Sequence, residues 1–235
     1  MKREYTNIVR YVMDELVPPV IRDSKAFMWP FYLAAYGKNA QKMMNFKTDA
    51  YHLSVDEYTK FYGDLESSIS RNRNTDLTLR TLNWIVDNVS DSDESILDVG
   101  CGNGYLLSEL HGRFSTASFA ACDAAAERSD LDFARYSQGL LPSLPFKERE
   151  FDVVCCSHVL EHVPRVEQAA KELVRVTRRK LLIVVPKQRY YYYTLDEHLN
   201  FFTKVDPLIA LFDRSRCYAH SMGGDWVLLV DTTEP

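Results

Sequence analysis

The chain has 235 residues, 46% of them hydrophobic and 26% charged, which is the balance of a globular protein with one large domain, or a core with an extension. Its 28 basic and 33 acidic side chains give a net charge of −5, which argues against nucleic-acid binding through phosphate neutralisation. The five cysteines are scattered and form no C-x-x-C pair, which indicates reduced thiols and a cytoplasmic protein rather than a disulfide framework. The most apolar run, residues 26–36, is too short to span a bilayer.

The first 90 residues have the pattern of helices. Apolar positions keep helical spacing over residues 8–16, and the prolines at 18–19 end that helix. Residues 54–57 (SVDE) have the spacing of a capping box and predict the start of another helix. One apolar stripe over residues 82–89 predicts a third.

After residue 94 short apolar runs alternate with helical patterns, which predicts a parallel sheet with right-handed crossovers. Two glycines at 223–224 predict a closing hairpin that adds an antiparallel strand. The predicted strands cover residues 95–99, 117–122, 133–138, 151–156, 180–185, 216–222 and 225–231, and the predicted helices cover 105–114, 166–176 and 206–212.

Three of the nine glycines, Gly100, Gly102 and Gly104, lie within five residues on the turn from the first strand to a helix. Glycines there let the backbone approach a ligand, and the free N–H groups of the helix start face it. Asp123 follows at the end of the second strand, where a carboxylate can bind both hydroxyls of a ribose. The spacing therefore predicts a nucleoside-containing cofactor. The loop reads G-x-G-x-G before Tyr105, and this differs from the dinucleotide fingerprint, which disfavours NAD.

Two segments resemble ordered motifs of class I S-adenosylmethionine-dependent methyltransferases. They are ILDVGCGNGYL at 96–106 and LPFKEREFDVVCCSHVLEHV at 144–163, and the resemblance covers roughly residues 80–235. It implies a Rossmann-like α/β fold, a doubly wound seven-strand sheet of order 3-2-1-4-5-7-6 with one antiparallel strand, behind an N-terminal helical extension. It also implies S-adenosyl-L-methionine as the cofactor. We predict that the extension covers residues 1–75 and the core residues 76–235.

The resemblance also implies which residues hold the cofactor. Asp123 would bind the ribose, and Ser157, with His158, would end the fourth strand beside the transferable methyl group. Members of the family often have an acidic residue that binds the adenine after the glycine that follows the third strand, and this chain has Leu140 there, after Gly139. The methionine part would be held by Asp98, Gly100, Cys101, Gly102, Asn103 and Gly104, and the adenine would be flanked by Leu140 and Leu141.

His158 and His198 are the candidate catalytic residues, because a histidine can accept the proton of a hydroxyl acceptor. Residues 158–162 also spell H-x-x-E-H, the inverted zinc-peptidase motif, but Pro164 disfavours the helix which that motif needs. We therefore predict no metal site. For His162 an orienting role and a direct role remain open, and His198 has the alternative of a structural bond to backbone.

The stretch after the fifth strand covers the substrate in related methyltransferases. His162, Tyr190 and Tyr192 are thus the candidate substrate contacts, and the alternative for the tyrosines is packing onto the N-terminal helices. Adjacent tyrosines cannot all face one way, so we expect about two of the four to line a pocket.

The aromatic segments at 17–39 and 46–54 look like those of methyltransferases associated with polysaccharide and surface-glycan clusters. We therefore expect methyl transfer to a hydroxyl oxygen of a sugar or glycan-type acceptor, with no nucleic-acid partner. A small-molecule N- or O-methyltransferase of another substrate class and a non-catalytic S-adenosylmethionine-binding partner protein are the alternatives. We interpret the extension as a lid over the acceptor; a stabilising cap, a homodimer interface and a peripheral membrane contact remain open for it.

Overall fold

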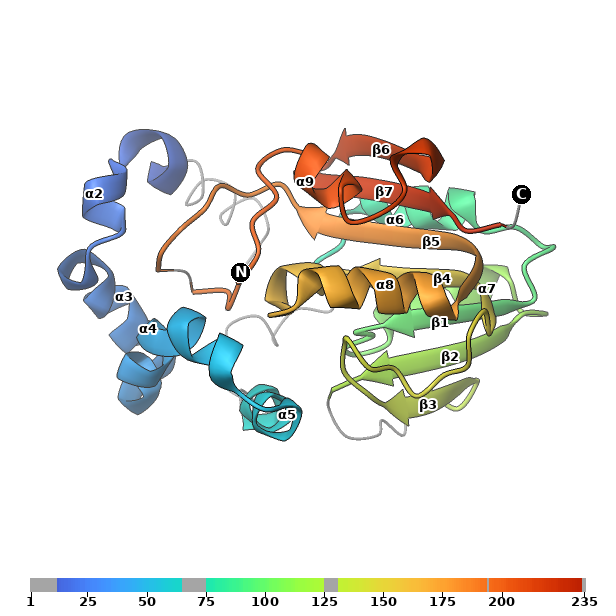
Figure 1. The fold of residues 1–235 in the computed structure, drawn as a ribbon, viewed down its shortest axis with the longest axis horizontal. Coiled ribbons are helices and arrows are strands. Elements are labelled where there is room, and N and C mark those ends of the chain that lie inside the picture. The colour runs from blue at the N-terminus through green and yellow to red at the C-terminus, as the bar shows by residue number, and fades with distance from the viewer. Residues whose placement is uncertain (1–11, 65–74, 125–130, 194, 234–235) are drawn as a thin grey trace.

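The computed structural model describes residues 12–64, 75–124, 131–193 and 195–233. Its centre is a seven-stranded sheet of order β3-β2-β1-β4-β5-β7-β6 (Figure 1). β7 is antiparallel to its neighbours β5 and β6, and all other neighbouring strands are parallel. This confirms the predicted fold class and strand order. The strands are β1 (Ser95–Val99), β2 (Ser118–Asp123), β3 (Ala134–Gln138), β4 (Phe151–Ser157), β5 (Thr177–Pro186), β6 (Cys217–Met222) and β7 (Asp225–Asp231).

Except for β5, each strand begins and ends within one residue of the bounds predicted from the apolar runs. β5 starts three residues before the predicted run at 180–185. Its early residues are polar, and two of them reach a buried carboxylate: Arg179 and Lys180 lie 3.0 and 2.7 Å from the oxygens of Asp93. Strand pairing with β4 therefore begins at Thr177, before the hydrophobic run starts.

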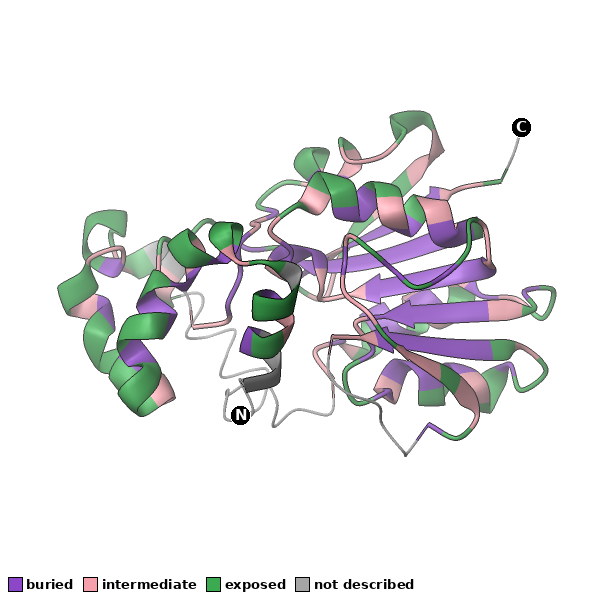
Figure 2. Cartoon of the chain, turned by 60° about the horizontal axis from the view of Figure 1, so that its bottom comes forward, coloured by how far each residue is buried: buried purple, intermediate pink, exposed green. Residues whose placement is uncertain are grey.

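Helices cover both faces of the sheet because successive strand side chains point to opposite sides. Ile96 and Val153 pack with α6 (Leu79–Asn88) and α7 (Tyr105–Arg113) on one face. Leu97 and Val154 pack on the other face with α8 (Val166–Val176) and the residues around α9 (Asp206–Ile209). Figure 2 shows the resulting layers, with almost fully buried central strands between half-exposed helices.

Two helix ends differ from the prediction. α6 begins before the predicted stripe because Thr78 and Thr81 form a capping box at its start. The helix predicted over 206–212 is wrong in extent, since α9 covers only Asp206–Ile209. Beyond it the N–H groups of Leu211 and Phe212 donate to carbonyls three residues back, which makes tight turns in place of α-helix.

The N-terminal extension is helical throughout its described part, as predicted. Residues 54–57 form the predicted capping box, in which the Ser54 N–H donates to the Glu57 carboxylate at 2.8 Å. Of the helix predicted over 8–16, residues 12–16 form one π-helical turn and residues 8–11 lie outside the described residues. The elements are η1 (Val12–Leu16), α2 (Pro19–Arg22), α3 (Lys25–Tyr36), η2 (Gly37–Asn39), α4 (Ala40–Asp49), η3 (Ala50–His52) and α5 (Val55–Asp64).

The extension has a small hydrophobic core of its own, in which Phe46 stacks on Phe61 with ring centroids 4.6 Å apart. Leu199, from the segment after β5, belongs to the same cluster. Figure 1 shows the extension (blue) beyond the carboxyl ends of the parallel strands. Among the described residues no helix is long and apolar enough to cross a membrane. The division at residue 75 stays a prediction.

Candidate functional site

The glycine-rich loop joins β1 to α7, and each of its glycines has a positive φ. A Cβ at Gly100 would lie 2.2 Å from Val159, and one at Gly104 would lie 2.5 Å from Leu131, so packing as well as backbone angle requires glycine there. Gly102, with φ +53°, differs, since nothing lies within 4 Å of its Cβ direction. The loop thus has backbone facing open space at its middle residue, where a ligand can approach.

Asp123 lies beside this loop, as the spacing predicted. Parallel pairing sets Val99 opposite Cys122, and the Gly102 N–H donates to the Asp123 carboxylate at 2.8 Å. Gly139, which follows β3, donates its N–H to the Asp123 carbonyl at 2.9 Å. The carboxyl ends of β1, β2 and β3 therefore meet around one carboxylate.

Asp98 is buried beneath the loop, opposite Ala121 of β2 and Cys155 of β4. Burial, with a smaller effect of the Asp123 charge, raises the pKa of Asp98 to about 8. A buried carboxyl that is hard to ionise becomes a good partner when a cationic group is placed near it. This fits the cationic methionine part of the predicted cofactor.

The remaining predicted cofactor residues differ in exposure. Cys101 is buried and donates its N–H to the Cys122 carbonyl, whereas Asn103 is exposed and accepts from the Tyr105 N–H at 3.1 Å. Leu141 is 4% exposed and packs in the sheet core, while Leu140 packs against the extension. The adenine contacts at these two leucines stay a prediction.

Ser157 ends β4 opposite Val184, and His158 follows it with a left-handed φ of 55°. The His158 Nδ1 lies 3.3 Å from the Glu161 carboxylate, and its Nε2 lies 3.9 Å from that of Asp225. Burial lowers the pKa of His158, but the two carboxylates outweigh burial and raise it above its ordinary value. The ring is therefore held between two negative charges.

The H-x-x-E-H segment is not an α-helix, which agrees with the reason for setting the peptidase motif aside. Residues Leu160–His162 form a short 3₁₀ turn, so His158 and His162 do not share a helical face. Glu161 in this turn is 0% exposed, and neither of its carboxylate oxygens accepts a hydrogen bond from the described residues. Burial opposes its ionisation, but His158, followed by His162 and His198, lowers the pKa of Glu161 to about 2.

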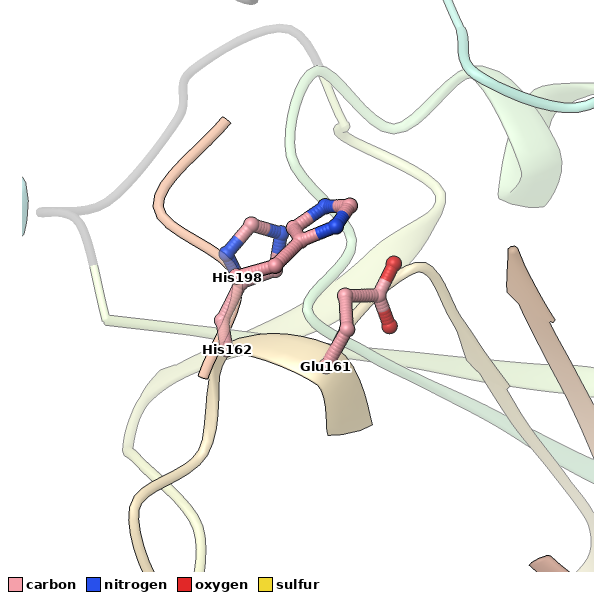
Figure 3. A group of neighbouring side chains, drawn as sticks. All are labelled: Glu161, His162 and His198. Carbon is pink, nitrogen blue, oxygen red and sulfur yellow. The ribbon is translucent and has the colours of Figure 1, made fainter. Parts of the chain in front are cut away.

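His198 comes from the segment after β5 and lies beside His162, with ring centroids 4.8 Å apart (Figure 3). Its Nδ1 lies 2.5 Å from the Gln188 side-chain oxygen, so its bond is to a side chain and the expected alternative of a backbone bond is wrong. The Nδ1 of His162 lies 3.3 Å from the Glu197 carbonyl. Burial, with the charge of His198, lowers the pKa of His162 to about 4.

Glu161 is the residue that sequence reasoning missed. It stands inside the motif that was set aside, and no spacing connects it with His198, which lies in a different segment of the chain. The connection is made by the backbone, because the N–H groups of Leu199 and Asn200 both donate to the Glu161 carbonyl, at 2.7 and 2.9 Å. The signal available in the sequence was the end of a buried strand followed, within five residues, by three ionisable side chains.

The tyrosine run alternates as expected for an extended segment. Tyr190 and Tyr192 are about half exposed, while Tyr191 is 7% exposed. Lys47 of α4 lies 4.6 Å from the Tyr190 ring centroid, and burial lowers the pKa of this lysine to about 8. Tyr190 also makes an edge contact with the Phe201 ring, so part of its surface packs against neighbouring residues.

The extension contacts the same segment and the turn after β4. The Tyr36 hydroxyl lies 2.7 Å from the Glu197 carboxylate and 2.6 Å from the Leu195 carbonyl. The Tyr58 hydroxyl donates to the carbonyl of His162. Burial, with a smaller effect of Asp196, raises the pKa of Glu197 to about 7, against the opposing hydrogen bond from Tyr36. The helices of the extension thus support the residues around the histidines.

Comparison with known proteins agrees with this geometry. Residues 97–185 match a methyltransferase domain. The matched segment runs from β1 to the end of β5 and contains the glycine loop, Asp123 and the turn after β4. The methyltransferase-domain match leaves the N-terminal extension outside it.

Two curated relatives give the scale of similarity. The uncharacterized methyltransferase YcgJ of Bacillus subtilis is 26% identical over 96 residues, which is 37% of this chain and 38% of that protein. The ubiquinone biosynthesis O-methyltransferase of Pseudomonas entomophila is 31% identical over 112 residues, 44% of this chain and 48% of that protein. The chain thus spans less than half the length of these two relatives.

Solved structures share the fold. A chain from the complex of a methyltransferase with the Trm112 methyltransferase activator, from Haloferax volcanii, aligns with a TM-score of 0.52 at 14% identity, covering 66% of this chain and 89% of that one. An S-adenosylmethionine-dependent methyltransferase from Aquifex aeolicus aligns with a TM-score of 0.50 at 13% identity, covering 77% of this chain and 100% of that one. The architecture is therefore the Rossmann-like fold of these methyltransferases.

Proposed function

We propose that the chain is an S-adenosylmethionine-dependent methyltransferase that methylates a hydroxyl oxygen of a small-molecule acceptor. The observation that carries this proposal is the open backbone at Gly102 beside the Asp123 carboxylate, on the strand order of the methyltransferases. The match of residues 97–185 to a methyltransferase domain supports it.

The residues present fit the cofactor. The Gly100–Gly104 loop offers an unobstructed approach at Gly102, Asp123 offers a carboxylate for ribose hydroxyls, and Asp98 offers a buried carboxyl for a cation. When bound, the cofactor supplies a methyl group already activated by its sulfonium. The contribution of this chain is to hold the donor and align the acceptor with it.

Transfer to a hydroxyl forms a carbon–oxygen bond, breaks the carbon–sulfur bond and releases the hydroxyl proton. His158 follows β4, which pairs with the strand that leads into the loop, and His198 lies beside His162 of the same turn, so these two imidazoles are our candidates for receiving the proton. The name of one curated relative, a ubiquinone biosynthesis O-methyltransferase, supports oxygen as the acceptor atom.

For the acceptor we propose a sugar or glycan-type molecule, held by aromatic side chains of the segment after β5 and of the extension. The half-exposed rings of Tyr190 and Tyr192 support this, since exposed aromatic rings can stack on a sugar-like or planar ligand. The curated relatives named as ubiquinone biosynthesis O-methyltransferases favour a second candidate, which is an acceptor from ubiquinone biosynthesis. A homodimer, a peripheral membrane contact and a cytoplasmic location stay predictions.

The test separates binding from transfer. Calorimetry with S-adenosylhomocysteine should show one site per chain, and NAD should not bind. Mass spectrometry should then detect methylation within a panel of sugars, nucleotide sugars and phenolic acceptors, and the transfer should be lost in Gly102→Val. Failure to bind S-adenosylhomocysteine contradicts the proposal, and binding without transfer to any acceptor favours a non-catalytic partner protein.

A further inference from the structure

The strongest unexplained group in the structure lies around Glu161, at the carboxyl ends of β4 and β5. Glu161, His162 and His198 each offer one ligand atom, and these atoms all lie within 4.8 Å of one another (Figure 3). Two of the residues belong to the turn after β4, and the third comes from the segment after β5. Hydrogen bonds from Leu199 and Asn200 to the Glu161 carbonyl fix the two segments together.

Glu161 is the residue of this group whose buried carboxylate lacks hydrogen-bond donors among the described residues. Its side chain is fully buried, and neither carboxylate oxygen accepts a hydrogen bond from the described residues. The nearest basic group among them is the His158 imidazole, at 3.3 Å from one oxygen. A buried carboxylate without hydrogen bonds is costly, and coordination to a cation is one of the ways in which proteins compensate it.

The two histidines are oriented as metal ligands usually are. The His198 Nδ1 faces the Gln188 oxygen at 2.5 Å, and the His162 Nδ1 faces the Glu197 carbonyl at 3.3 Å. Because both neighbours are acceptors, we assign the proton to Nδ1 in each ring, which directs Nε2 toward coordination. Gln188 is itself positioned, since its side-chain amide nitrogen lies 3.4 Å from the Asp196 carboxylate and its backbone carbonyl accepts from the Thr203 hydroxyl.

We propose that Glu161, His162 and His198 bind one divalent first-row transition-metal ion, such as Zn²⁺, Mn²⁺ or Co²⁺. Two imidazoles and one carboxylate are the ligand set that such ions prefer, whereas Mg²⁺ and Ca²⁺ favour oxygen ligands alone. Metal–ligand distances of about 2.1 Å require neighbouring ligand atoms roughly 3–3.5 Å apart, so the rings close in by about 1 Å on binding.

The ion would have open coordination positions, because only three protein ligands are present among the described residues. The site follows β4, the strand that pairs with β1, and β1 leads into the glycine loop, so an acceptor oxygen can occupy one of those positions. This last step rests on the proposed function, whereas metal binding itself does not. The ligand set also differs from the peptidase motif, since His158 faces carboxylates and His198 takes its place. With the ion bound, both ring nitrogens of His198 are engaged, so His158 would be the group that receives the acceptor proton.

The experiment measures metal binding directly, on the full-length chain. After treatment with a chelator, calorimetry with ZnCl₂ or MnCl₂ should show one ion per chain, and Co²⁺ should give the visible absorption of a nitrogen- and oxygen-coordinated ion. Glu161→Gln keeps the shape of the side chain, and His198→Ala removes one ligand. Each should weaken binding at least about tenfold, as expected when a ligand of a three-residue site is lost.

The matched control is His220→Ala, which removes an exposed histidine of β6 and should leave metal binding unchanged. Binding of S-adenosylhomocysteine by each variant checks that the chain is folded and stands apart from the metal question. A wild-type chain without saturable binding of Zn²⁺, Mn²⁺ or Co²⁺ overturns the site, and so does binding by Glu161→Gln and His198→Ala at wild-type strength. Metal binding without methyl transfer would support the site while contradicting the proposed function.

Discussion

The glycine loop after β1 and the histidine cluster after β4 (His158, Glu161, His162 and His198) lie at the ends of two paired parallel strands, yet they are built in different ways. The loop is made of consecutive residues whose positive φ angles and close neighbours demand glycine. The cluster is assembled from a 3₁₀ turn and a distant segment, and it is supported by helices of the extension. A site made of consecutive residues can be recognised from their spacing in the sequence, whereas a site assembled from distant segments cannot.

Gly102→Val should have the largest effect on the loop. The branched side chain would enter the open space where the cofactor is expected, and β-branched residues rarely adopt a φ of +53°. We expect S-adenosylhomocysteine binding to weaken at least about a hundredfold, a change of about 2.7 kcal/mol or more in binding free energy.

The matched control is Gly112→Ala in α7, where nothing lies within 4 Å of the added carbon. It should bind the ligand normally and be slightly more stable. A folded Gly102→Val chain that binds at wild-type strength would show that the loop is only a turn.

Asp123→Ala tests the other half of the loop site. The variant removes the carboxylate expected to bind the ribose and also the acceptor of the Gly102 N–H bond. Charge-assisted hydrogen bonds contribute about 1.5–3 kcal/mol each, so calorimetry should show binding weakened at least about tenfold.

Asp132→Ala, which removes an exposed carboxylate nine positions further along the chain, serves as the control for Asp123→Ala. Equal affinity in the Asp123 and Asp132 variants would remove Asp123 from the cofactor site.

Strand alternation and glycine spacing are local signals, so the residues alone predicted the strands and the pairing of the loop with Asp123, whereas the sheet order was predicted from the family resemblance. The sequence was insufficient where side-chain partners decide the outcome. The early, polar part of β5 is an example, because Arg179 and Lys180 both reach the carboxylate of Asp93. Asp93 lies 86 positions before Arg179, so no local pattern connects the two.

The histidine cluster shows the same limit more clearly. His198 was chosen as a candidate residue, but its contact with Gln188 and its closeness to Glu161 depend on hydrogen bonds that join distant segments. The H-x-x-E-H motif contains His158, Glu161 and His162 but does not predict that His198 lies beside His162, because periodicity says nothing about which chain segment packs against a turn.

Asp98→Asn tests the buried carboxyl beneath the glycine loop through the pH dependence of stability. With its pKa raised to about 8, Asp98 is protonated in the folded chain at pH values where it is ionised in the unfolded chain. The free energy of unfolding should therefore fall as pH rises from about 4 to about 8, by the linkage of proton binding to folding. The asparagine variant should lack this decline, so its stability relative to wild type should be greater at pH 8 than at pH 4 by at least about 1.4 kcal/mol, the equivalent of one pKa unit.

Chemical denaturation at pH 4, 6 and 8 measures this difference, and the two proteins should be closest in stability at pH 4. Parallel pH profiles for wild type and Asp98→Asn would contradict the buried, protonated carboxyl.

The smallest expected effect, Tyr36→Phe, asks whether the extension supports the histidine cluster and leaves the loop untouched. The variant removes the hydroxyl that contacts the Glu197 carboxylate and the Leu195 carbonyl, in the segment that leads directly into His198. Loss of one such hydrogen bond is worth about 1 kcal/mol, so the segment carrying His198 should be held less firmly. We expect the KM for the acceptor to rise about two- to fivefold, the change that ~0.5–1 kcal/mol produces, with S-adenosylhomocysteine affinity unchanged. Tyr218→Phe, at an exposed tyrosine of the edge strand β6, is the control and should change neither quantity. An unchanged acceptor KM in Tyr36→Phe would mean that the extension only caps the core, and a weakened affinity for S-adenosylhomocysteine would mean that the two regions are coupled.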